Sequence, residues 1–183
     1  MTAEQAAPTD IIAFWREAGK ERWWKKDDAF DATIRSRFLS VWETARAGGL
    51  QDWRTSDDGL LALTIVLDQF PRNMFRGDAR TYATDPLARE VASQAIAAGA
   101  DGRVDQTLRQ FLYMPFMHSE ALADQERCIA LFGAAGEAEN AKFAQRHAHI
   151  VRRFGRFPHR NKMLGRTTTD EEQAFLDEGG FSG

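Results

Sequence analysis

The sequence predicts an all-α protein, and three observations lead to this fold class. Apolar residues recur at helical spacing through most of the chain. Hardly any stretch alternates apolar and polar residues, as a half-buried strand must. Glycines, prolines and capping residues divide the periodic stretches into segments of ordinary helix length. We therefore expect about eight helices, packed as a bundle of antiparallel helix pairs in one domain over residues 1–183.

Capping residues and glycines mark the first four helices. Asp10 and Asp27 (or its neighbour Asp28) can accept hydrogen bonds from the exposed amides of a first turn. Asp85 precedes Pro86, whose missing amide costs nothing at the first helical position. The third helix is apolar on nearly every side, which predicts a place at the centre of the domain. The expected ranges are residues 10–19, 27–47, 56–70 and 85–99.

The second half of the chain shows similar signals. Pro115 is expected to end the fifth helix, and Ser119 can cap the sixth. Gly155 stops a long seventh helix. Thr169, with Glu172 three residues later, forms the pattern of a capping box for a short last helix. The expected ranges are residues 104–113, 119–132, 137–154 and 169–178.

The composition is typical of one soluble globular protein. Hydrophobic residues make up 43% and charged residues 28% of the 183 residues, and the net charge of -3 predicts no obligate polyanion partner. The single cysteine, Cys128, excludes an intrachain disulfide. No signal segment is visible, and no apolar stretch reaches the roughly 20 residues that span a bilayer. The sequence therefore predicts a cytoplasmic protein that does not contact a membrane.

The third predicted helix carries an acid on its buried side. Asp68 shares a stripe with core residues, in what is expected to be the last turn, where the helix dipole disfavours a carboxylate. Pro71 is expected to end this helix and turn the chain. A buried carboxylate requires a cationic or hydrogen-bonding partner, and the candidates are Arg72, Arg76 and Arg80.

A second stretch is similar to the one that follows Asp68. The sequence FPRNMFRG covers residues 70–77, and FPHRNKMLGR covers residues 157–166 with one inserted residue. Each follows a long apolar helix. This pattern is typical of an internal structural repeat in which each helix pair ends in the same turn. Phe and Pro would cover the core, and Arg-Asn, which includes Asn73, would hold the turn.

Three further polar residues stand out after the middle of the chain. His118 lies beside Ser119 and Glu120, and capping of the next helix explains those two neighbours without chemistry. Glu126 falls on the inward stripe of the sixth predicted helix, which predicts a second buried acid. His147 falls between apolar residues of the seventh, which predicts a buried imidazole.

Several long stretches resemble a known family. They read LDQFPRNMFRG (residues 67–77), LYMPFMHSEALADQE (112–126) and RRFGRFPHRNKMLGR (152–166), followed by TTTDEEQAFL. On these motifs the chain, from Ile11 to Phe181, resembles the bacterial domain-of-unknown-function family 924. The resemblance implies a helical fold similar to tetratricopeptide-repeat folds. Because that family has no established activity, the resemblance implies no catalytic residues.

The distribution of charge suggests a ligand site. Residues 142–166 contain eight Lys or Arg, three His and no acid. If the two Phe-Pro stretches converge, their arginines would form a cleft for a small anion, a phosphate or a carboxylate. In an enzymatic version, a histidine would transfer a proton and an acid would orient it. The candidate ligand-binding residues are Asp68, Arg72, Asn73, Arg76, His118, Glu126, His147, Arg153, Arg156 and Arg160.

Other interpretations remain open. The arginines can instead pair with the buried acids in a purely structural network, within an interaction scaffold of tetratricopeptide-like type that binds a protein partner. Nucleic acid is disfavoured, since a basic run is more often a solvated face. The histidines lack metal-ligand spacing, and no cofactor motif is present. The sequence decides neither the oligomeric state nor whether a reaction occurs. An open cleft with spare guanidinium donors would favour ligand binding. A fully paired network would favour the scaffold.

Overall fold

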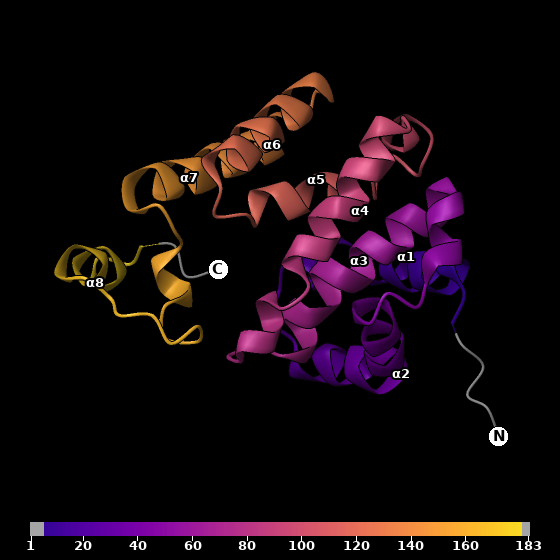
Figure 1. Cartoon of the computed structure of the whole chain (residues 1–183), viewed down its shortest axis with the longest axis horizontal. Coiled ribbons are helices and arrows are strands. Elements are labelled where there is room, and N and C mark those ends of the chain that lie inside the picture. The colour runs from indigo at the N-terminus through magenta and orange to yellow at the C-terminus, as the bar shows by residue number, and fades with distance from the viewer. Residues whose placement is uncertain (1–5, 181–183) are drawn as a thin grey trace. The chain divides into compact units, whose positions relative to one another are not determined.

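A computed structural model describes residues 6–180 and shows an all-α protein, as predicted (Figure 1). No strand occurs among these residues. Two of the short 3-10 helices matter below, η1 (Gln51–Thr55) and η4 (Pro158–Arg160). The α-helices of the described part are α1 (Pro8–Trp23), α2 (Asp28–Arg46), α3 (Asp57–Met74), α4 (Asp85–Ala97), α5 (Gln110–Met117), α6 (Leu122–Ala134), α7 (Ala138–Phe154) and α8 (Asp170–Asp177).

The packing of the chain divides into two compact units. Unit 1 comprises Met1–Arg76 and Arg80–Pro115, and unit 2 comprises Gly77–Ala79 and Phe116–Gly183. The boundary falls inside α5, after Pro115. One domain over residues 1–183 therefore stays a prediction, and each unit is described by itself. Phe181, where the resemblance in sequence ends, lies outside the described residues.

Helix α3 forms the centre of unit 1, in agreement with its apolar sequence. It packs against α1, α2, α4 and η1 (Figure 1), and residues 59–71 are all buried. Around it lies a cluster of aromatic rings, in which Phe70 contacts Trp15 and Phe38 at centroid distances of 5.7 and 5.0 Å. This burial of large apolar side chains fixes the direction of α3 and of the polar residues that it carries.

The prediction that Pro71 ends the third helix was wrong. Helix α3 continues through Pro71 to Met74. A proline inside a helix leaves the carbonyl four residues earlier without its amide partner. Here that carbonyl belongs to Leu67, and the Thr84 hydroxyl donates to it at 2.6 Å. Asp68 therefore lies inside the helix rather than in its last turn, where the dipole would oppose its charge.

Gly59 allows η1 to approach the first turn of α3. A Cβ atom at this position would lie 1.9 Å from the carbonyl oxygen of Trp53. Any side chain here would therefore push η1 away from α3. Because Arg54 follows Trp53 on η1, this close approach also fixes the position of Arg54.

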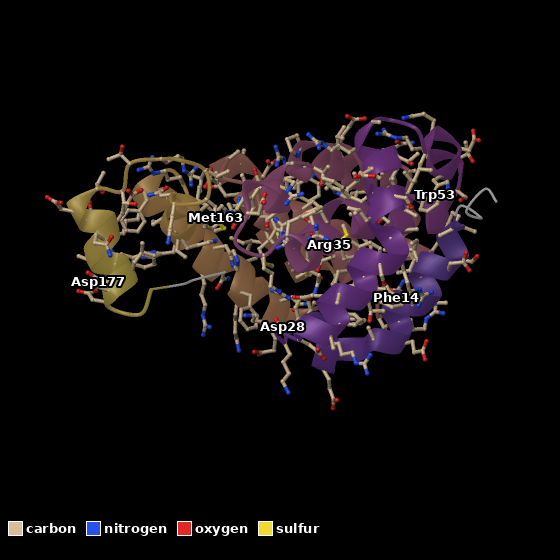
Figure 2. All side chains as sticks on the ribbon, turned by 90° about the horizontal axis from the view of Figure 1, so that it is seen from below. Phe14, Asp28, Arg35, Trp53, Met163 and Asp177 are labelled. Atoms are coloured by element: carbon tan, nitrogen blue, oxygen red, sulfur yellow. The ribbon has the colours of Figure 1, made fainter. Side chains whose placement is uncertain are left out.

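Unit 2 is built on the pair α6 and α7, which pack side by side (Figure 1). Its buried cluster contains Ile150, Val151 and Phe157, with Phe175 of α8 packed against them. The predicted capping box of α8 is present, because Thr169 and Glu172 exchange hydrogen bonds. Asp177, the last residue of α8, is labelled in Figure 2.

The two ends of the fifth predicted helix and the start of the sixth differ from the prediction. Helix α5 begins at Gln110 and runs past Pro115, and α6 begins at Leu122. Ser119 does not cap α6 at its N-cap position, which is Ala121. From the loop before α6, its hydroxyl instead accepts from the amide of Ala121 and donates to Asp124 in the first turn of α6. Pro115 and Ser119 lie near the ends of these helices, but Pro115 does not end α5 and Ser119 does not cap α6.

Candidate functional site

The predicted site residues of unit 1 form a buried ion network, which we call the Arg72 network: Arg72, Asp68 and Asp85. Arg72 donates to both oxygens of Asp85, at 2.9 Å from Nη1 and 3.1 Å from Nη2. Its Nη1 also lies 3.3 Å from Asp68 Oδ1. The Asp68 side chain is fully buried. Arg72 is thus the cationic partner that the sequence predicted for Asp68.

Electrostatics keep this network ionised. Burial alone would lower the pKa of Arg72, but the charges of Asp68 and Asp85 outweigh it and raise the pKa above its usual range. Gln69 donates to the second oxygen of Asp68 at 2.5 Å. The ring of Tyr82 lies 6.0 Å from the guanidinium carbon. Protein groups therefore satisfy this buried charge on several sides.

Asn73 and Arg76 meet at a third acid of unit 1, Asp31 on α2. Asn73 Nδ2 donates to Asp31 Oδ1 at 2.7 Å, and Arg76 donates to both oxygens of the same carboxylate. The Asp31 side chain is 13% exposed. These contacts join the end of α3 to the start of α2.

Glu172 holds the predicted residues of unit 2 in the same manner. Arg156 donates to both of its oxygens, at 2.6 and 2.8 Å, and Asn161 donates at 3.1 Å. The amide of Thr169 adds a fourth bond. The side chain of Glu172 is 3% exposed. These donors, with Arg156 the strongest, lower the pKa of Glu172 to about 2.

Glu120 is a central residue of unit 2 that the sequence analysis explained away as a helix start. It lies outside α6 and accepts from both terminal nitrogens of Arg166, at 2.7 and 3.0 Å. The amide of Phe157 donates to it at 2.8 Å. Burial opposes its ionisation, but these donors outweigh burial and lower its pKa. The signal that could have found it is the acid-free segment 142–166, whose arginines need partners from elsewhere in the chain.

The prediction of a buried acid at Glu126 was wrong. Its side chain is 60% exposed and lies 3.6 Å from Arg152. The buried positions of α6 are Gln125, Cys128 and Phe132, so the inward stripe is one residue out of phase with the predicted one. Gln125 donates its amide hydrogens to backbone carbonyls of the segment that precedes α6. The apolar pattern missed this stripe because a polar residue, Gln125, occupies its first buried position.

The remaining predicted residues of unit 2 lie in different surroundings. His147 is buried, as predicted, with Nδ1 at 2.8 Å from the carbonyl oxygen of Phe143. Arg160 is buried against the ring of Phe157, while Arg153 is largely exposed and pairs with Glu171 at 3.0 Å. His118 is half-buried at the end of α5.

The two Phe-Pro stretches do not repeat one conformation. Residues 70–74 continue α3, whereas Phe157 precedes the 3-10 helix η4. The stretches also belong to different units. Their asparagines have a similar role instead, because Asn73 donates to Asp31 in unit 1 and Asn161 donates to Glu172 in unit 2. Arg76 of the first stretch also donates to Asp31, whereas the arginine that donates to Glu172 is Arg156, which precedes the second stretch.

A cleft of unit 1 contains an arginine with a different arrangement. It measures about 230 Å³ and lies between α2, η1, α3 and α4. Its apolar lining includes the buried Leu50, Leu63 and Leu67, with the half-buried Leu87. Arg54 lines the cleft as well. Trp53, which precedes it on η1, is labelled in Figure 2. We call this feature the Arg54 cleft.

Arg54 is held by fewer contacts than the arginines of the ion networks. Its Nη1 lies 2.6 Å from Oε1 of Glu90 and 3.3 Å from Oε1 of Gln94. The Nε atom is buried and has no hydrogen-bond partner among the described residues. A buried donor without a partner costs about 1–3 kcal/mol. The Nε edge of this guanidinium therefore has a hydrogen-bonding capacity that no described protein group uses.

A comparison with known families agrees with the resemblance that the sequence motifs indicated. Residues 11–180 match the family described as bacterial protein of unknown function, DUF924. The chain belongs to this family. It is also similar to a solved structure, the protein of unknown function ATU0120 from Agrobacterium tumefaciens, with 46% sequence identity and a TM-score of 0.90. That match covers 94% of this chain and 97% of the other.

The family description assigns no activity, so function rests on the residues of this chain. No protein with curated function matches it. Within residues 6–180, no helix is long and apolar enough to cross a membrane. In the same part of the chain, no three His, Cys, Asp or Glu side chains are grouped to hold a metal ion.

The Arg54 cleft is the feature that sequence reasoning missed. Arg54 lies in a short segment between the glycines that end α2 and the cap of α3, with no periodic pattern around it. The leucines that line the cleft come from three separate elements and each fits an ordinary core position. A composition or spacing signal for such a cleft does not exist in the sequence.

Proposed function

We propose that the protein binds a small carboxylate ligand, and that Arg54 in the Arg54 cleft is the residue that binds it. The observation that carries this proposal is the state of the guanidinium. It contacts the Glu90 carboxylate through one nitrogen, and its Nε has no hydrogen-bond partner in the described part of the chain. Arginine pairs with carboxylates most strongly through two parallel hydrogen bonds. A ligand carboxylate that takes the place of Glu90 could use Nε and a terminal nitrogen together.

The same reasoning argues against three of the arginines that the sequence analysis selected. Arg72, Arg76 and Arg156 each already hold a protein carboxylate by two bonds. A ligand anion at one of them would have to separate an ion pair that is at least partly buried, and leaving one partner of a buried pair alone typically costs about 3–5 kcal/mol. In this proposal those residues hold the helices of each unit together.

The apolar lining supports an organic ligand over an inorganic anion. Leu50, Leu63 and Leu67 are 6%, 3% and 1% exposed, and all three lie along the cleft. A hydrocarbon group placed against them leaves water, at roughly 0.8 kcal/mol for each methylene. Phosphate or sulfate would make no use of this surface.

A thermal-shift series tests the proposal on the full chain. The probes are short aliphatic carboxylates, aliphatic amino acids, phosphate and sulfate. A probe at a hundred times its dissociation constant adds about 2.7 kcal/mol, which raises Tm by about 5–10 °C for a chain of this length. We expect a carboxylate to give this shift, and phosphate and sulfate to give none.

Two variants make the test specific to the cleft. Arg54→Gln should abolish the shift while the protein stays folded. Arg16→Gln is the matched control, because Arg16 also makes a single contact, to Asp105 at 2.7 Å, but does not line the cleft. An unchanged shift in Arg54→Gln, or no shift with any carboxylate, would rule out this proposal.

A second candidate is an interaction scaffold similar to tetratricopeptide folds. Two large apolar side chains support it, Trp24 in unit 1 and Phe143 in unit 2, which are 52% and 49% exposed. Helix pairs such as α6 and α7 are the building blocks of such scaffolds. In this case Trp24→Ser or Phe143→Ser should abolish a crosslink to a cellular protein that the wild type forms, with Tm unchanged. A set of crosslinks unaffected by both changes would exclude these surfaces.

A further inference from the structure

The rim of the Arg54 cleft carries one positive and one negative side chain. Glu90, from α4, lines the cleft together with Arg54 and lies 2.6 Å from its Nη1. The Glu90 side chain is 61% exposed and the Arg54 side chain is 19% exposed. Because Glu90 is largely in water, moving it away from Arg54 costs less than separating a pair whose acid is buried. The pair can therefore open without disturbing the apolar lining.

This rim is poorly matched to a ligand that has only a negative charge. A monocarboxylate bound at Arg54 would lie next to the Glu90 carboxylate, and like charges at this separation repel each other. A ligand with one positive and one negative group avoids that conflict. Its carboxylate replaces Glu90 at Arg54, and its cationic group gives Glu90 a new partner, so one ion pair is exchanged for two.

We infer that the Arg54 cleft binds an aliphatic α-amino acid, an inference that rests on the proposed function. The carboxylate of the ligand pairs with Arg54, the ammonium pairs with Glu90, and the side chain lies against the leucines. These three chemical groups occur together in an aliphatic α-amino acid, in which the ammonium and the carboxylate are bonded to the same carbon. Arg54 and Glu90 are likewise neighbours on one rim.

Side-chain amides supply the remaining acceptors that an ammonium needs. An ammonium group has three N–H donors, and one carboxylate does not saturate them. Gln51 lines the cleft and donates its amide nitrogen to the carbonyl of Gly48 at 2.9 Å, which leaves its Oε1 as the acceptor. Gln94 Oε1 lies 3.3 Å from Arg54 Nη1, on the same rim. Both oxygens can accept from a cation that enters beside Glu90.

The volume sets the size of the ligand. A cleft of 230 Å³ holds about seven or eight water-sized groups, at roughly 30 Å³ each. Valine and leucine have about this number of non-hydrogen atoms, whereas aromatic amino acids exceed it. Leu87 is half-buried and lines the cleft, so its side chain limits the length that the ligand can have.

Isothermal titration calorimetry with three probes of one carbon skeleton tests the inference. The probes are leucine, 4-methylpentanoate, which lacks the ammonium, and 3-methylbutylamine, which lacks the carboxylate. We expect leucine to bind at least about tenfold more tightly than either analogue, because each analogue loses one charge-assisted pair and tenfold corresponds to about 1.4 kcal/mol.

Variants of two residues identify the contacts. Glu90→Gln should remove the preference for leucine over 4-methylpentanoate, while Glu17→Gln, an exposed acid of α1, should keep it. Leu87→Ala should shift the preferred amino acid to a longer side chain, and Leu87→Phe to a shorter one. The two Leu87 changes act in opposite directions, so general destabilisation cannot produce both.

The outcomes separate this inference from the proposed function. If 4-methylpentanoate binds as tightly as leucine, the amino-acid inference is overturned and a carboxylate function survives. If leucine is preferred but the preference survives in Glu90→Gln, the assignment of the ammonium to Glu90 is overturned. If none of the three probes binds, both the inference and the proposed function are overturned.

Discussion

Arg72 and Arg54 belong to the same unit and are about equally buried, with side chains 18% and 19% exposed. Arg72 holds Asp85 by two bonds and lies beside Asp68, and both acids are buried. Arg54 holds one exposed acid through one nitrogen. The two arginines therefore differ in the number of their bonds to protein carboxylates and in the exposure of those carboxylates, and not in burial. In our proposal, this difference separates a structural arginine from a binding one.

The largest expected effect is on the Arg72 side of the comparison. Arg72→Met should lower the free energy of unfolding by about 3–5 kcal/mol, because Asp68 and Asp85 stay buried without their cation. Urea unfolding followed by tryptophan fluorescence measures this loss, since all five tryptophans lie in unit 1. The double variant with Asp85→Asn should recover part of it. A loss below 1 kcal/mol would show that this network is not structural.

A second prediction compares how the stability of each unit depends on pH. Burial, with Arg160 and His147 nearby, lowers the pKa of His159 in unit 2 to about 4, from an ordinary value of 6.5. The unfolded chain therefore binds this proton more readily than the folded one. The contribution of the uncharged His159 side chain to the free energy of unfolding is complete above pH 6.5. It is lost as the pH falls from 6.5 to 4, and the loss is on the order of 3 kcal/mol.

Two optical signals can follow that loss. Far-UV circular dichroism reports helices of both units, and tryptophan fluorescence reports unit 1 alone. On acidification to pH 4.5 we expect urea to reduce helicity before it changes fluorescence. His159→Gln should flatten the pH dependence, whereas His149→Gln, at an exposed position of α7, should leave it unchanged. Coincident transitions at every pH would contradict this prediction.

The sequence predicted the helices well because their signals are local. Spacing, caps and glycines belong to neighbouring residues, and Asp27 and Thr169 cap helices as expected, whereas α1 begins at Pro8, before the predicted cap Asp10. Burial of Asp68 also follows from spacing, because its stripe on α3 contains core residues. Its partner Arg72 lies four residues away, within the reach of the same local argument.

The misses required information from distant residues. The helix passes through Pro71 because Thr84, from another segment, donates to the carbonyl that the proline leaves open. Glu126 was misplaced because the buried residue of this turn is the polar Gln125, whose bonds to the carbonyls of Met117 and Ser119 the apolar pattern could not indicate. The Arg54 cleft forms only where four elements meet. No arrangement of neighbouring residues contains these facts.

A third prediction compares a closed and an open ion pair on one helix. Glu172 and Glu171 of α8 are adjacent, but Glu172 is 3% exposed and held by Arg156 through two bonds, while Glu171 is 65% exposed and pairs with Arg153 through one. Glu172→Gln should cost about 1.5–3 kcal/mol and Glu171→Gln less than 1 kcal/mol. Hydrogen exchange of α8 measures both. Equal costs would contradict the bond-counting rule drawn from Arg72 and Arg54.

The smallest expected effect on stability is the one that decides the comparison. Arg54→Gln loses one bond to an exposed acid and removes a buried donor that lacks a partner, so the free energy of unfolding should change by less than about 1 kcal/mol. Ligand-induced stabilisation should nevertheless disappear. Arg54→Lys should recover only part of it, because lysine keeps the charge but loses the two-pronged geometry. If Arg54→Gln instead destabilises the protein as strongly as Arg72→Met, Arg54 is a structural residue, and the difference between the two arginines has no functional meaning.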